Sequence, residues 1–316
     1  MPNIISYCRE NMDQLCESTR TAGYGTVWDR ATDVALRTTI LPITGKLDTA
    51  LETELNRAFH EFVTGGFSTP VNLGSWNAYG RGLKATKRAH VMVAQIMQQP
   101  HSDSGPSFVQ TLAAEGFTVQ EITETLLSYS IGSLLTNVNI LSDTLLELAR
   151  RPEWRARIAA EPMEVRSPED DSDAMRFVRE CLRLHPPEAL CFRHNPDGPI
   201  DIGEWGVIPR GCNICPNLAE HLMNLGEEFD PDRWADPQAV RDDFIVFGHR
   251  TTHTCPSLHL ALLELMTFAR VIAREYDVEI VDSTLVREYN LGSMWLNSGP
   301  FMTYKDGLKV KVTKRA

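Results

Sequence analysis

The sequence has no long hydrophobic run. No stretch of about 18 or more apolar residues occurs among its 316 residues, so no transmembrane helix is predicted. The opening residues MPNIISYCRENMDQ lack the basic segment and apolar run of a secretory signal. Basic residues are not in excess either: the net charge is −11 and the pI is about 5.3, which argues against nucleic-acid binding. We expect a cytoplasmic protein with no nucleic-acid partner and no membrane span.

Cysteine residues are few and show no pairing pattern. The chain has seven, an odd number, scattered along its length. Without a secretory signal they are expected to be reduced thiols. Cys212 and Cys215 form a CxxC, but they lie in a β-like segment, where positions i and i+3 point to opposite faces. No second CxxC follows, so two separate core cysteines are favoured over a metal or redox pair.

Internal repeats, low-complexity segments and linker-like composition are also lacking, so we expect one domain over residues 1–316. Hydrophobic residues make up 42% and charged residues 23%, an ordinary globular composition. Apolar residues recur at helical spacing over the first two thirds. Short β-like segments follow, and the closing segments VEIVD and GLKVKVTKR alternate as strands do. These patterns predict a mainly α fold with a small β-sheet.

A long helix is predicted to begin after Thr118, which can form a capping box with Glu121, and to end before Pro152. One face carries an apolar stripe of Leu127, Ile131, Leu134, Val138, Leu141, Leu145 and Leu148. A second stripe is small and polar: Ser128, Gly132, Thr136, Asn139 and Asp143. This second stripe is either a solvent-facing strip or the polar lining of a cavity.

Three charged residues form a second pattern. Glu180 and Arg183 lie on one face of a helix predicted over residues 173–184. By itself this spacing indicates a surface ion pair worth a few tenths of a kcal/mol. Arg233 lies in the loop FDPDRW, which is rich in proline and aromatic residues and is an unusual place for a free surface charge.

A further cluster, within residues 247–266, contains His249, His253, Cys255 and His259. Zinc ligation, a Cys/His nucleophilic pair and a single metal-binding thiolate are all compatible with it, although the spacing matches no usual zinc pattern and nothing marks an oxyanion site. Pro256 is predicted at the first position of a helix. Cys255 would then precede a helix N-terminus, where the peptide dipoles are expected to lower the thiol pKa.

Taken in order, these features resemble the cytochrome P-450 superfamily of heme-thiolate proteins. The resemblance rests on GSLLTN in the long helix, LELARRPEW after it, ECLRLHPP, FDPDRW and FGHRTTHTCPSLHLALLE. It covers essentially the whole chain. The segment at residues 62–88 resembles the branch that hydroxylates sterols, retinoids and abscisic acid. The implied fold is that of a cytochrome P-450 without its N-terminal strands and first helices.

The resemblance implies a role for each motif residue. Cys255 would be the axial ligand of the iron in heme b, and His253 and Arg193 would donate to the heme propionates. Thr136 would help to deliver protons to oxygen. Glu180, Arg183 and Arg233 would form a structural network that braces the cysteine loop. Residues expected at the substrate pocket are Gly132, Ser133, Met294, Trp295 and Leu296. The implied activity is oxidation of a small lipophilic substrate, with a redox partner or a peroxide.

Three departures from the family pattern bear on this expectation. The family's opening segments are lacking, so a protein partner could cover that region. The loop from Phe247 to Cys255 is one residue longer than usual, and Ser257 replaces a glycine that allows close approach to heme. Leu135 replaces the acid that usually precedes the helix threonine. The last change suits peroxide-driven or rearranging chemistry. The alternatives are a heme-free partner or scaffold protein, and a zinc or thiol enzyme.

Overall fold

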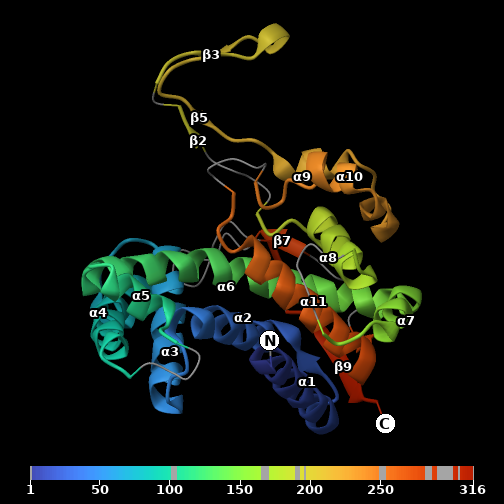
Figure 1. Cartoon of the computed structure of the whole chain (residues 1–316), viewed down its shortest axis with the longest axis horizontal. Coiled ribbons are helices and arrows are strands. Elements are labelled where there is room, and N and C mark those ends of the chain that lie inside the picture. Colours follow the sequence, from blue (N-terminus) through green and yellow to red (C-terminus); the bar gives the residue numbers. More distant parts are fainter. Residues whose placement is uncertain are drawn as a thin grey trace.

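The protein folds as a helical body with small sheets, which confirms the predicted mainly α class (Figure 1). This computed structural model describes residues 2–100, 105–164, 171–188, 193–195, 197–248, 254–281, 287–289, 302–304 and 307–315. Among the described residues, no helix combines the length and the apolar character needed to cross a bilayer.

The helices follow one another closely over the first two thirds of the chain. The described α-helices are α1 (Pro2–Ala22), α2 (Val27–Thr44), α3 (Thr49–Gly66), α4 (Ala78–Met97), α5 (Phe108–Ala114), α6 (Val119–Arg150), α7 (Pro152–Ala160), α8 (Asp173–Leu184), α9 (Leu218–Met223), α10 (Pro237–Asp242) and α11 (Leu258–Glu275). Short 3-10 helices are η1 (Gly74–Trp76), η2 (Gly203–Trp205) and η3 (Pro231–Ala235).

The described strands form one three-stranded sheet and several two-stranded ribbons. The larger sheet has the antiparallel order β1 (Gly25–Thr26), β9 (Lys309–Lys314) and β6 (Tyr276–Ile280). The ribbons pair β2 (Arg193–His194) with β5 (Asn213–Ile214), β3 (Ile200–Asp201) with β4 (Val207–Ile208), and β7 (Arg287–Tyr289) with β8 (Met302–Tyr304). The two closing strands predicted from alternation are therefore confirmed.

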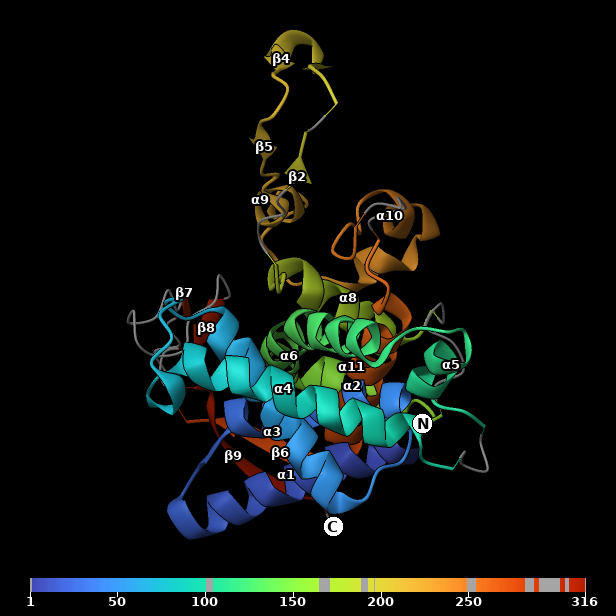
Figure 2. The same ribbon diagram turned by 90° about the vertical axis from the view of Figure 1, so that its left-hand side faces the viewer.

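Helix α6 crosses the whole body, and α11 packs against it as well as against α1, α7 and α8 (Figures 1 and 2). The capping box predicted for α6 is present. The Thr118 amide donates to the Glu121 carboxylate at 2.8 Å, and the Glu121 amide donates to the Thr118 hydroxyl at 3.3 Å. Its apolar stripe is buried at Leu127, Val138, Leu141, Leu145 and Leu148. The buried apolar residues of α6 and α11 thus belong to one hydrophobic core.

Between β2 and β5 the chain forms a long hairpin that stands away from the helical body in both views (Figures 1 and 2). Large apolar side chains are exposed on it, with Trp205 at 82% and Val207 at 59%. Cys212 is half-buried and Cys215 is exposed. The prediction of two core cysteines is therefore wrong, because this hairpin does not fold back onto the core.

Candidate functional site

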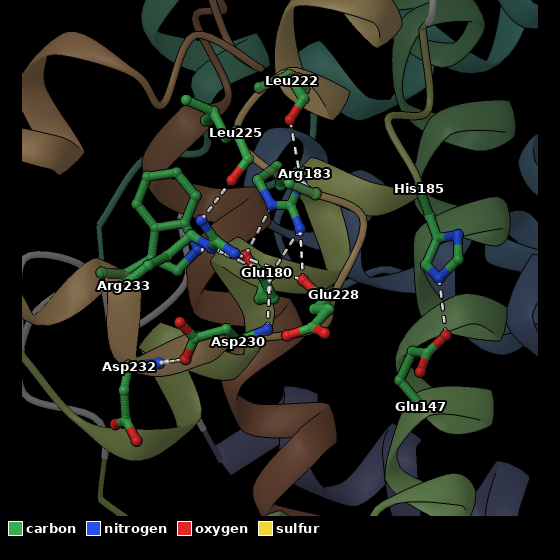
Figure 3. A network of polar contacts seen from close by, with 12 residues as sticks. Glu147, Glu180, Arg183, His185, Leu222, Leu225, Glu228, Asp230, Asp232 and Arg233 are labelled. Carbon is green, nitrogen blue, oxygen red and sulfur yellow. Dashed lines mark hydrogen bonds and ion pairs between the residues drawn. The ribbon is translucent and has the colours of Figure 1, made fainter.

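Helix α8 carries a buried ion pair rather than a surface one. The side chains of Glu180 and Arg183 are both 0% exposed. Arg183 donates to the Glu180 carboxylate through Nε at 2.9 Å and through Nη2 at 2.8 Å (Figure 3). Its remaining N–H groups donate to the backbone carbonyls of Leu222, Gly226 and Glu228. A guanidinium so enclosed is stable only because its charge and its donors are satisfied.

The Glu180 carboxylate also binds the segment around η3. It accepts the Asp230 amide at 2.8 Å, Arg233 Nε at 3.2 Å and the Trp234 indole N–H at 2.9 Å. Figure 3 shows Glu180 and Arg233 converging, with Arg233 also donating to the Leu225 carbonyl at 2.8 Å. The structure therefore brings together the three residues predicted as a structural network.

An aromatic series links this network to the cysteine loop. The Trp234 and Phe244 rings lie 5.3 Å apart in an edge-to-face arrangement, and Phe244 and Phe247 lie 6.1 Å apart. The Phe247 carbonyl accepts the Cys255 amide at 2.8 Å. Gly248 follows with a φ of 90°, a left-handed conformation that glycine adopts without strain. A series of contacts thus runs from Glu180 to the backbone at Cys255.

Cys255 is half-buried just before α11. That helix begins at Leu258, later than Pro256, because the chain first makes a turn in which the Leu258 amide donates to the Cys255 carbonyl at 3.2 Å. The thiol pKa is raised, mainly by burial and also by the Glu188 carboxylate, although the Ser257 amide donates to the sulfur and opposes this shift. The expectation of a lowered pKa is wrong, because α11 begins only at Leu258 and burial disfavours the charged form of the Cys255 sulfur.

The middle of α6 is open on one side. Gly132 is exposed, and Ser133 and Thr136 are half-buried. The Ser133 hydroxyl donates to the Tyr129 carbonyl at 2.8 Å, and the Thr136 hydroxyl donates to the Gly132 carbonyl. Farther along, Asn139 and Asp143 are buried, at 2% and 0% exposed. The polar stripe is therefore not a solvent-facing strip along its whole length.

The remaining predicted site residues are placed as follows. Arg193 is exposed in β2. Burial raises the pKa of the Glu188 carboxyl, and the charge of Arg193 opposes this in part. His253, Met294, Trp295 and Leu296 lie outside the described residues, as does His249. His259 is described and is exposed on α11.

The chemistry of Cys255 suits a single thiolate ligand. In the described part of the chain, no group of three or more His, Cys, Asp or Glu side chains could hold a metal ion. The Ser257 amide donates to the Cys255 sulfur and favours its ionised form, although burial is the larger influence and raises the pKa of the thiol. Sequence reasoning missed the residues that hold this loop, Trp234, Phe244 and Phe247, because aromatic residues in a loop carry no periodic signal.

Comparisons with known proteins agree with the site. The sequence model of the cytochrome P450 family matches residues 60–303. Abscisic acid 8'-hydroxylase 1 of Arabidopsis thaliana is 23% identical over 343 residues, which cover 100% of this chain and 70% of the relative. A sterol 14alpha-demethylase of Mycolicibacterium vanbaalenii is 29% identical over 216 residues, covering 60% of this chain and only 47% of its own length.

Solved structures share the fold. The retinoic acid bound cyanobacterial CYP120A1 superposes with a TM-score of 0.77 at 17% identity, covering 100% of this chain and 74% of that one. P450BioI in complex with a fatty-acid-ligated acyl carrier protein has a TM-score of 0.70 at 19% identity, covering 98% and 72%. Because the family match extends over most of the chain and the fold agrees, this protein belongs to the cytochrome P450 family.

Proposed function

We propose that this chain is a heme-thiolate monooxygenase that acts on a small lipophilic substrate. The observation that carries the proposal is the position of Cys255. Its amide donates to the Phe247 carbonyl at 2.8 Å. The ring of Phe247 belongs to the aromatic series that starts at Trp234, and Trp234 is bonded to Glu180. A cysteine in an arbitrary surface loop would need no such buried support. Family members act on lipophilic substrates and use redox partners, and we infer both for this chain.

We infer heme b as the cofactor. Cys255 would supply the thiolate ligand, with Arg193 and His253 as donors to the propionates. Heme with a thiolate ligand supplies oxygen activation when bound, because the sulfur raises the electron density at iron. The chain itself would contribute orientation, exclusion of water and proton access. We infer that Thr136 would be the hydroxyl that helps to move a proton. Its side chain is half-buried and bonds within its own helix turn to the Gly132 and Ser133 carbonyls.

The substrate is inferred from the open face of α6 and from the relatives. Gly132 presents no side chain there, and a Cβ built on it meets nothing within 4 Å, so a ligand could approach the backbone closely. Met294, Trp295 and Leu296 remain predicted parts of the same pocket. Two relatives are named for abscisic acid and a sterol, and the superposed CYP120A1 is bound to retinoic acid. All three compounds have a hydrocarbon ring skeleton. Leu135 leaves no carboxylate beside Thr136, which favours a peroxide or a rearranging reaction over reductive oxygen activation.

The test is a reduced carbon monoxide spectrum of the purified full-length chain supplied with heme. We expect a thiolate-type band, its loss in Cys255→Ala, and its retention in the matched control Cys215→Ala, since Cys215 is exposed on the hairpin. Absence of a heme spectrum from the wild-type chain would refute the proposal. A spectrum that Cys255→Ala leaves unchanged would assign the iron to another ligand.

A heme-free partner protein is the second candidate. The observation that favours it is the exposed apolar surface of the hairpin, where Ile200, Ile202, Trp205 and Val207 are all at least 41% exposed. Such a surface is typical of a site that another polypeptide covers. The same experiment separates the two candidates, because a partner protein of this kind would show no heme spectrum.

A further inference from the structure

A buried carboxyl lies where α11 packs against α6. Glu264 of α11 is 3% exposed. Its Oε2 accepts a hydrogen bond from Asn137 Nδ2 at 3.0 Å across a sequence separation of 127 residues. Its Oε1 is buried without a hydrogen-bond partner. Asn137 follows Thr136 directly, so this contact joins the helix after Cys255 to the helix that carries Thr136.

The surroundings of Glu264 favour its neutral form. Burial raises its pKa to about 8, and the neighbouring Thr38 hydroxyl of α2, which itself donates to the Val34 carbonyl, opposes this only in part. The titratable group facing it from α1 is Cys8, whose own pKa burial raises further, so this thiol is neutral as well. No cation in the contacts that the structure gives compensates a charge at this point.

The charged groups on the other helices that pack against α11 are engaged elsewhere. On α8, Arg183 is bonded to Glu180, and Arg179 interacts with Asp171. On α7, Arg157 is bonded to Asp173. Farther along α11 itself, Arg270 is bonded to Glu161 at 3.0 Å. On α6 the contact is Asn137, which has no charge. An ionised Glu264 would therefore be a buried charge without a counter-ion, which is costly.

We propose that Glu264 is a positioning residue whose protonated carboxyl ties α11 to α6 and so sets the helix of Thr136 relative to the loop of Cys255. In the neutral acid, Oε2 accepts the hydrogen bond from Asn137 and the proton is held on Oε1. No charge is then buried away from water. When the carboxyl ionises, the contact is retained only with water or a movement of the helices. The roles of Thr136 and Cys255 rest on the proposed function, but the tie between the helices does not.

The first test is hydrogen exchange of the full-length chain, corrected for the intrinsic effect of pH, between pH 6 and 9.5. We expect amides of residues 132–140 and 258–266 to lose protection as the pH rises past about 8. Glu264→Gln cannot ionise and should keep the protection at every pH. The exposed control Glu279→Gln, at a position with 72% side-chain exposure, should behave as the wild type. Equal pH profiles for wild type and Glu264→Gln would overturn the proposal.

A second pair of variants separates positioning from simple packing. Glu264→Ala removes the carboxyl that accepts from Asn137, and Asn137→Leu removes the amide that donates to Glu264. Both variants lack the hydrogen bond at every pH, so both should show the faster exchange already at pH 6. Rescue by glutamine but not by alanine is expected. If Asn137→Leu exchanges as the wild type does throughout, the tie does not position α6 and the inference fails.

A spectroscopic readout connects the tie to the heme. In the heme-loaded chain, the thiolate band of the wild type should weaken above pH 8, whereas that of Glu264→Gln should stay constant. Parallel loss of the band in both proteins would contradict a role toward Cys255. If the wild type binds no heme, the proposed function fails, and hydrogen exchange still decides whether Glu264 joins the helices.

Discussion

Replacing Glu180 by alanine should be among the most destabilising single changes in this chain. The carboxylate accepts five hydrogen bonds, from Arg183, Arg233, Trp234 and the Asp230 amide. Its removal leaves Arg183, which is 0% exposed, as a buried charge without its partner. Breaking a buried ion pair from one side typically costs about 3–5 kcal/mol. At roughly 2 °C per kcal/mol for a chain of this size, the melting temperature should fall by about 6–10 °C.

The measurement is unfolding followed by circular dichroism in urea and by heating. Glu180→Gln keeps the shape of the side chain and loses its charge, so it should lie between the wild type and Glu180→Ala. The control is Glu17→Ala, because Glu17 pairs with Arg20 at 53% and 75% exposure and such pairs contribute about 0–1 kcal/mol. If Glu180→Ala and Glu17→Ala cost the same, the buried network does not support the fold as described.

Three further predictions follow from other contacts. Gly82→Ala should destabilise the chain by about 1–3 kcal/mol in urea unfolding, because a Cβ at this position would lie 3.0 Å from the Gly65 Cα on α3. The control is Gly66→Ala, since a Cβ at Gly66 would meet nothing within 4 Å. Burial raises the pKa of Glu264 from its ordinary value of 4.5 to about 8, so the folded state holds this proton more tightly than the unfolded state does. The free energy of unfolding should therefore fall by roughly 5 kcal/mol between pH 4.5 and 8 and then level off, relative to Glu264→Gln measured at each pH. Trp234→Phe removes the indole N–H that donates to the buried Glu180 carboxylate at 2.9 Å; it should cost about 1.5–3 kcal/mol in the same unfolding assay, and a cost below 0.5 kcal/mol would contradict the assigned bond.

Much of the local structure is determined by the sequence alone. The capping box of Thr118 and Glu121 forms as predicted, since both partners lie within one helical turn. The helix at residues 173–184 and the closing strands also form where the pattern places them, because helix and strand periods depend on neighbouring residues. The order of the motifs was enough to indicate the family, since each motif is a short continuous segment.

Burial, in contrast, was decided only by the tertiary structure. The spacing of Glu180 and Arg183 indicated an ordinary surface pair, and only the packing of the η3 segment over α8 makes it an enclosed network. The CxxC of Cys212 and Cys215 looked like part of a strand in the core, yet it lies on a hairpin away from the body.

The environments of Cys255 and Glu264 were likewise decided by the tertiary structure. Helix position predicted a lowered pKa for Cys255, but burial, which depends on residues distant in the sequence, raises it. Glu264 looks like one polar residue in an apolar helix, and its contact with Asn137 spans 127 residues. Local hydrogen bonds and periodicity are properties of adjacent residues and can be read from the chain. The environment of a charge is a property of what the fold places around it, and only the assembled helices determine that.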